Sequence, residues 1–116
     1  MTIREALDAA AADVGAPAPR EADGGIEWAV EGAVFAAAKG DAAEFRLDPL
    51  VARAALGTPD TRPSRRGDDW IAFTPPVLDR FARDRAVAWF GSAYRRASAV
   101  ERSQESRRPR SGDRGR

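Results

Sequence analysis

The stretch Gly67-Asp68-Asp69-Trp70-Ile71-Ala72-Phe73-Thr74-Pro75-Pro76 decides the fold, because it combines a turn, a short apolar strand and the signals of a helix start. Alternate side chains of residues 70–74 face opposite sides of a strand. Both sets are mainly apolar, which indicates an internal strand that is covered on both sides. Thr74 suits an N-cap, and Pro75 suits a first helical position because it has no N–H to satisfy. We therefore expect a helix to begin at Pro75.

The residues before this stretch predict a helix and then a meander of strands. Thr2 and Glu5 have the spacing of a capping box, and apolar residues recur at helical spacing as far as Val14, so we expect a helix over 3–14. Glycine turns separate three alternating or apolar segments, at 25–31, 33–39 and 42–47. Together with the internal strand, they predict an antiparallel sheet of about four strands.

Helical sequence surrounds a polar loop in the second half of the chain. Asp48 and Pro49 start a short helix whose stripe of apolar residues is predicted to face the core (Leu50, Val51, Ala54, Ala55). Residues 58–69 are polar and long for a connection, which favours a functional loop. From 75 to about 99, two apolar stripes separated by charged residues predict a short helix followed by a longer one.

The domain organisation follows from these patterns and from the charge distribution. Residues 98–116 contain six Arg against three acidic residues, a net charge of +3, whereas the remaining residues contain 13 basic and 15 acidic groups, a net charge of −2. We expect residues 1–97 to form a single α+β domain with its helices packed on one face of the sheet. Residues 98–116 are expected to form a disordered basic tail.

The composition excludes several kinds of chemistry. The 116 residues include no cysteine and no histidine, which excludes disulfides, thiol chemistry and catalysis or metal binding by histidine. We therefore expect no enzyme, no catalytic residues and no cofactor. No apolar run approaches the ~20 residues of a membrane span, and the N-terminus lacks the pattern of a signal peptide. A cytoplasmic location without membrane contact is the expectation.

Several short segments resemble the MmcQ/YjbR-like family. They are Gly32-Ala33-Val34-Phe35-Ala36, Phe45-Arg46-Leu47-Asp48-Pro49, Pro63 ahead of Gly67-Asp68-Asp69-Trp70-Ile71, and Ser92-Ala93-Tyr94. The resemblance covers about residues 28–97 and implies a CyaY-like α+β fold. The family is often described as DNA-binding, so the resemblance also implies nucleic-acid contact. The chain departs from the family pattern at Ala33 and Arg46, where lysine is usual, and at Ala93, which separates a Ser-Tyr pair.

Basic residues in the polar loop are the candidate site for nucleic acid or another anion. Arg62, Arg65 and Arg66 stand beside a predicted sheet edge, and guanidinium groups bind phosphate oxygens in a bidentate manner. Lys39 and Arg46 are added as basic residues of the neighbouring strands. The alternative is a solvated loop, because acidic residues are interleaved with the arginines (Asp60, Asp68, Asp69).

Other polar and aromatic residues have structural interpretations. Asp68 and Asp69, with Asp60, could supply oxygen ligands to Mg²⁺ or Ca²⁺, but turn formation is favoured and no metal site is predicted. Glutamates on the sheet face are expected to form cross-strand ion pairs rather than a catalytic pair (Glu27, Glu31, Glu44). The three tryptophans are expected to fill the core rather than to line a ligand pocket (Trp28, Trp70, Trp89).

These observations favour a small binding module of unidentified partner. One hypothesis is weak, non-specific binding of nucleic acid through residues 62–66 and the basic tail. The alternative is a protein-interaction module that uses the exposed face of the sheet, and an enzyme that acts through carboxylates ranks third. The first hypothesis requires the loop arginines to lie on a surface free of carboxylates. The second requires an apolar or mixed patch on the sheet.

Overall fold

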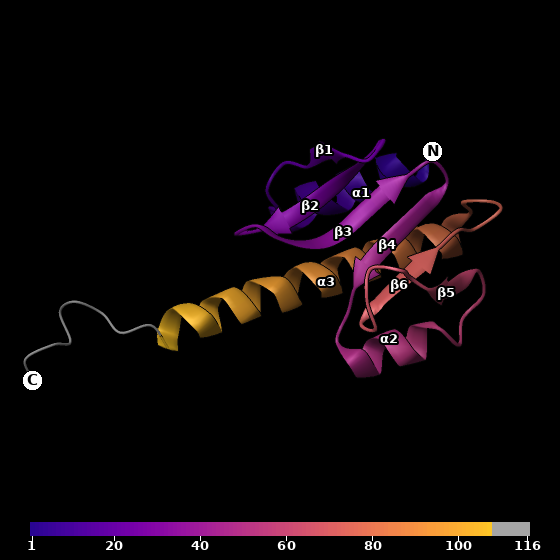
Figure 1. The fold of residues 1–116 in the computed structure, drawn as a ribbon. Coiled ribbons are helices and arrows are strands. Elements are labelled where there is room, and N and C mark those ends of the chain that lie inside the picture. The colour runs from indigo at the N-terminus through magenta and orange to yellow at the C-terminus, as the bar shows by residue number, and fades with distance from the viewer. Residues whose placement is uncertain (108–116) are drawn as a thin grey trace, which may run out of the picture.

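The computed structural model describes residues 1–107, with side chains described as far as Val100, and it is an α+β fold (Figure 1). Six strands form one antiparallel sheet in the order β1-β2-β3-β4-β6-β5. The elements follow the chain in the order α1 (Ile3–Val14), β1 (Arg20–Ala22), β2 (Gly25–Val30), β3 (Ala33–Lys39), β4 (Ala42–Arg46), α2 (Pro49–Ala55), β5 (Thr61–Pro63), β6 (Trp70–Phe73) and α3 (Arg80–Arg107). The predicted fold class is confirmed.

The first helix has the predicted ends. The Thr2 hydroxyl accepts from the Glu5 N–H at 3.1 Å, and the Glu5 carboxylate accepts from the Thr2 N–H at 2.7 Å, which completes the capping box. These hydrogen bonds lower the pKa of Glu5, with the Thr2 backbone N–H the largest cause. At the other end, Gly15 adopts the left-handed conformation at φ 72°, which ends the helix because glycine has no Cβ to clash there.

The strands at 25–30, 33–39 and 42–46 form the predicted meander, and β6 is internal to the sheet as predicted, between β4 and β5. Two further strands, β1 and β5, were not predicted. Each is three residues long and lies at an edge, so neither shows an apolar alternation. Pro63 is compatible with β5 because an edge strand leaves some N–H positions without a ladder partner.

The helices α1 and α3 pack on the same face of the sheet and enclose the core. Phe90 of α3 packs edge-on against Trp28 and Phe35, with ring centroids 5.3 Å apart in both pairs. Trp89 packs against Phe73 in the same manner at 5.2 Å. Small residues surround these rings and are fully buried, so the helix can approach the sheet closely (Ala36, Ala43, Ala86, Ala93).

A β-bulge in β3 places one of these aromatic rings. Trp28 of β2 pairs with Ala36, but the next residue, Ala29, pairs with Val34, so Phe35 is an extra residue in the ladder. The extra residue brings Phe35 onto the helix-covered face, where it also contacts the ring of Tyr94 at 5.6 Å. Regular alternation along the sequence would not have placed Phe35 and Ala36 in the same core.

The predicted helix start at Pro75 is wrong. The chain remains extended after β6, and the Thr74 N–H donates to the Asp60 carbonyl at 2.9 Å. The long helix begins at Arg80, and Asp79 caps it by accepting from the Ala82 N–H at 2.8 Å. The physical reason is that Thr74 and Pro75 each precede a proline, which disfavours helical backbone at both positions.

The predicted pair of helices after 75 is also wrong, because α3 is one continuous helix of 28 residues. It continues through Arg107, past Ser98, where the predicted tail began. Residues 108–116, the rest of that predicted tail, lie outside the described residues. Within residues 1–107, no helix combines the length and the apolar composition needed to cross a membrane.

The short helix α2 begins at the predicted position but turns a different face to the core. The Asp48 carboxylate accepts from the Leu50 N–H at 3.0 Å, as expected of a cap. Ala52 and Ala55 are buried, whereas Leu50 is 72% exposed and Val51 is 38% exposed. In a helix of only two turns, a shift of one residue in the apolar stripe costs little periodicity, so the sequence does not fix its phase.

Candidate functional site

The face of the sheet opposite α1 and α3, here called the polar face, carries one row of residues across all six strands. The strand register places these residues side by side, in the order Arg20, Glu27, Ala37, Glu44, Ala72, Arg62. Charged residues of both signs thus alternate with alanines. The row explains why Glu27 and Glu44, far apart in sequence, lie two strands apart on one surface.

Arg66 joins the two glutamates of this row. Its Nη1 lies 3.0 Å from the Glu27 Oε2 atom, and its Nε lies 2.9 Å from the Glu44 Oε1 atom. The guanidinium also lies over the ring of Trp70, 5.2 Å from the ring centroid. The Ser64 hydroxyl donates to the second oxygen of Glu44. We call these four polar residues, Arg66, Glu27, Glu44 and Ser64, the Arg66 cluster.

The surroundings of the Arg66 cluster make it a fixed structural group. The Arg66 side chain is 31% exposed and that of Glu27 only 11%. Partial burial acts to lower the pKa of Arg66, but hydrogen bonds to Glu44 and Glu27 and the charges of both carboxylates outweigh it and raise the pKa. Arg66 therefore stays charged and engaged, and it is not a free donor for a phosphate group.

The five predicted site residues do not gather in one place. Arg62, on edge strand β5, and Arg65, in the turn after it, are exposed and form no ion pair with any described residue. Lys39 ends β3 and lines a hollow at the β1–β2 turn. Arg46 belongs to a different ion-pair group. Only Arg62 and Arg65 keep the exposure and neighbouring positions that the anion hypothesis required.

A second charged group surrounds Asp69. Its Oδ2 atom accepts from the Nε of Arg46 at 2.9 Å and from the Nη1 of Arg96 at 3.1 Å. Partial burial acts to raise the pKa of Asp69, but the hydrogen bond and charge of Arg46, with the hydrogen bond from Arg96, lower it overall. Sequence reasoning missed Arg96; its position between Ala93 and Ala97 on the predicted helix was the available signal.

The predicted cross-strand pairing of glutamates exists but involves other partners. Glu27 pairs with Arg20 at 3.5 Å as well as with Arg66, and neither Arg46 nor Lys39 takes part. Of the three tryptophans, Trp28 and Trp89 lie in the core below the helices, as predicted. Trp70 lies on the polar face, where it is 7% exposed beneath Arg66.

The predicted turn aspartates have backbone roles. Asp60 adopts a positive φ of 67°, a conformation that aspartate tolerates better than most residues. The Asp69 carbonyl accepts from the Leu47 N–H at 2.8 Å, which ties the turn to the end of β4. Across residues 1–107, no three His, Cys, Asp or Glu side chains lie close enough together to hold a metal ion.

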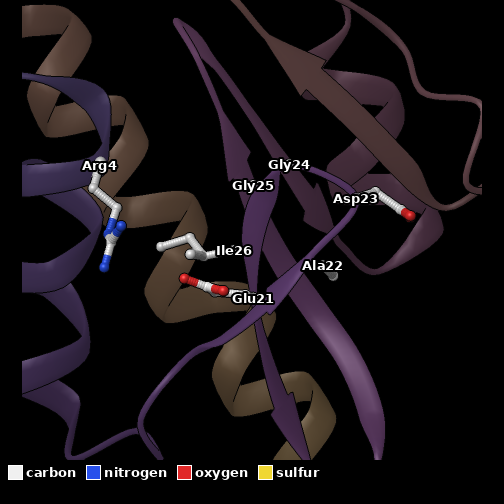
Figure 2. A pocket seen from close by; sticks show the side chains of 7 residues that line it. All are labelled: Arg4, Glu21, Ala22, Asp23, Gly24, Gly25 and Ile26. Atoms are coloured by element: carbon white, nitrogen blue, oxygen red, sulfur yellow. The ribbon is translucent and has the colours of Figure 1, made fainter.

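The widest surface hollow, about 500 Å³, lies at the turn between β1 and β2 (Figure 2). Arg4 of α1 and Glu21 of β1 face the space between their two elements, whereas the Asp23 side chain points away from it. The floor is the Asp23-Gly24 turn, with φ values of 50° and 80°. Since its charged groups do not converge, the hollow is a consequence of the hairpin rather than a built site.

Comparison of the chain with protein-family models gives no match, and comparison with curated proteins gives none either. Among solved structures, the chain is similar to a protein from Pseudomonas syringae whose crystal structure was determined by a structural-genomics consortium. The TM-score is 0.60 at 11% sequence identity, over 84% of this chain and 99% of that chain. At this identity the similarity establishes a shared fold and nothing about function.

Proposed function

We propose that this domain is a non-catalytic binding module of the MmcQ/YjbR-like type that contacts polyanions such as nucleic acid weakly and without sequence preference. The observation that carries the proposal is the division among the loop arginines. Arg66 neutralises Glu27 and Glu44, so the carboxylates nearest the loop are already paired. Arg62 and Arg65 remain exposed and available for phosphate contact.

The environment of the carboxylates supports a role without catalysis. A general acid at neutral pH needs a carboxyl group whose pKa is raised by burial. Asp69 has the opposite shift, because Arg46 and Arg96 stabilise its charged form. Glu27 and Glu44 are likewise held in ion pairs with arginine.

A titration with single- and double-stranded nucleic acid at several salt concentrations tests the proposal. We expect micromolar or weaker affinity at ~50 mM salt, because residues 1–97 have a net charge of −2. The Arg62→Ala, Arg65→Ala double variant should bind all sequences more weakly and show a smaller salt dependence, by about one unit of slope per lost contact. Arg53→Ala, at an exposed position on α2, is the matched control and should bind as the parent does.

Two results would contradict the proposal. The first is an absence of binding at ~50 mM salt, and the second is an equal loss of affinity in the Arg53→Ala control. Either result would leave the second candidate, a protein-interaction module.

The protein-interaction candidate is favoured by α2 rather than by the sheet face. Leu50, Val51 and Leu56 are the exposed large apolar residues of this region, and they stand on one short helix and its C-terminal cap. The polar face of the sheet, by contrast, carries Glu27, Glu44 and the arginines paired with them. A partner captured by the parent protein should be lost with Leu50→Asp, which removes apolar contact area without touching a loop arginine.

A further inference from the structure

A smaller cleft lies between α3 and the adjacent ends of β3 and β4, and we call it the α3 cleft. Its volume is about 280 Å³, near the lower end of the range for small-molecule sites. Most of its wall is apolar and comes from two elements, β3 (Ala33, Val34, Phe35) and α3 (Ala93, Ala97, Val100). The remaining lining residues are Arg46 and Arg96. The cleft thus combines an apolar wall with two cationic side chains.

Asp69 holds both cationic side chains of the α3 cleft in place. One carboxylate oxygen accepts from Arg46 at 2.9 Å and from Arg96 at 3.1 Å. Two guanidinium groups and one carboxylate give the group a net charge of +1. The terminal nitrogens of Arg46 and the Nη2 of Arg96 have no hydrogen-bond partner among the described residues. A positive charge and several N–H donors therefore remain for a ligand.

The partial burial of the group strengthens its interaction with an anion. The side chain of Arg96 is 28% exposed and that of Asp69 is 21% exposed. Charge-assisted hydrogen bonds are stronger in such surroundings than in water, because fewer solvent molecules compete for the donors. Since Asp69 already fixes the arginines, a ligand would not have to order them, and less conformational entropy would be lost on binding.

We propose that the α3 cleft binds a small aliphatic monocarboxylate, with its carboxylate at Arg46 and Arg96 and its hydrocarbon chain against Val34, Phe35 and Ala97. The single surplus positive charge matches a monoanion, and the apolar wall matches a short alkyl chain. A free short-chain acid and the terminal carboxylate of a chain that ends in an apolar residue present this same chemistry. The site is separate from Arg62 and Arg65, so the proposal does not rest on polyanion binding.

An NMR titration of the full chain with hexanoate is the primary test. We expect saturable shifts of backbone amide signals confined to residues 33–35, 46 and 93–100. Acetate, which lacks the alkyl chain, and hexanol, which lacks the charge, should each bind at least tenfold more weakly. N-acetyl-leucine against N-acetyl-leucinamide distinguishes the two sources: a terminal carboxylate is favoured if N-acetyl-leucine binds more tightly than hexanoate, and a free acid if it binds less tightly.

Two variants test the two halves of the α3 cleft independently. Arg96→Gln should weaken hexanoate binding roughly tenfold, as expected for the loss of one charge-assisted hydrogen bond. Ala97→Phe should fill the cleft and weaken binding at least as much while both arginines stay in place. Arg95→Gln, which changes an exposed neighbour on the same helix, should bind as the parent does. The dispersion of each amide spectrum reports whether the variant is folded.

The proposal is overturned by any of three results. Hexanol may not bind as tightly as hexanoate, the shifted signals must not lie mainly outside the cleft, and a folded Ala97→Phe variant must not keep the parent affinity. The last result would stand even if Arg96→Gln proved unfolded, since Ala97 takes no part in the Asp69 group.

Discussion

The two faces of the sheet are built by different physical means. The face below α1 and α3 is held by aromatic rings and alanines, and it is closed to solvent. On the polar face, Arg66 lies across Glu27, Glu44 and Trp70. The first face depends on the volume and shape of its side chains, whereas the second depends on one cation placed between two anions. Each face should therefore respond to a different kind of substitution.

The largest expected effect is on the helix-covered face. Phe90→Ala should lower the free energy of unfolding by roughly 3–5 kcal/mol, because it leaves a cavity next to Trp28 and Phe35. Urea unfolding measures the change. A loss below about 1 kcal/mol would show that α3 does not pack on the sheet as described, because a deeply buried ring would not be so easily replaced.

The next effect is on the polar face. Arg66→Ala should cost about 1–3 kcal/mol, more than an exposed ion pair contributes, because it leaves two partly buried carboxylates without their shared partner. Arg66→Lys keeps the charge but cannot reach both glutamates in the same planar geometry, so it should recover only part of the loss. Full recovery by lysine would mean that charge alone, and not the geometry of the guanidinium, holds this face.

A pH effect separates the Asp69 group from both faces. The pKa of Asp69 is lowered in the folded protein, so its charged form contributes stability above the unfolded pKa of about 4. This contribution is lost as the pH falls through the lower folded pKa. Asp69→Asn should therefore be less stable than the parent at pH 7, and the difference should shrink below about pH 4. A difference independent of pH would contradict the ion-pair account.

The smallest expected effect concerns the exposed arginines. Arg62→Ala and Arg65→Ala should each change the free energy of unfolding by less than about 0.5 kcal/mol, since neither side chain forms an ion pair with a described residue. Urea unfolding of both variants beside Arg66→Ala compares three neighbouring arginines under identical conditions. Equal losses at all three positions would remove the distinction between structural and exposed arginines.

The sequence was sufficient for the elements whose signals are local. The capping box at Thr2 and the glycine turns of the meander depend on residues a few positions apart, and both were predicted. The Asp23-Gly24 pair was an equally local signal for the β1–β2 hairpin and was overlooked. The helix start at Asp79 was misplaced because Thr74 and Pro75 carried a cap-like pattern that the following prolines override.

The candidate sites depend on contacts that no local pattern encodes. Arg66 meets Glu27 across 39 positions of sequence, and Arg96 meets Asp69 across 27. The order β4-β6-β5 brings the loop over the sheet, and this order was not evident from the strand patterns. The bulge at Phe35 similarly becomes visible only when β2 and β3 are aligned. Arginines that look equivalent in sequence therefore take different roles in the fold.

A double-mutant cycle between Arg66 and Glu44 tests the central claim most directly, namely that Arg66 is a structural cation rather than a free binding residue. The free energies of unfolding are measured for the parent, Arg66→Ala, Glu44→Gln and the double variant. We predict a coupling energy of about 1 kcal/mol or more, because the Arg66 Nε and the Glu44 Oε1 lie 2.9 Å apart in a partly buried setting. A coupling energy indistinguishable from zero would contradict the claim and return Arg66 to the candidate ligand-binding residues.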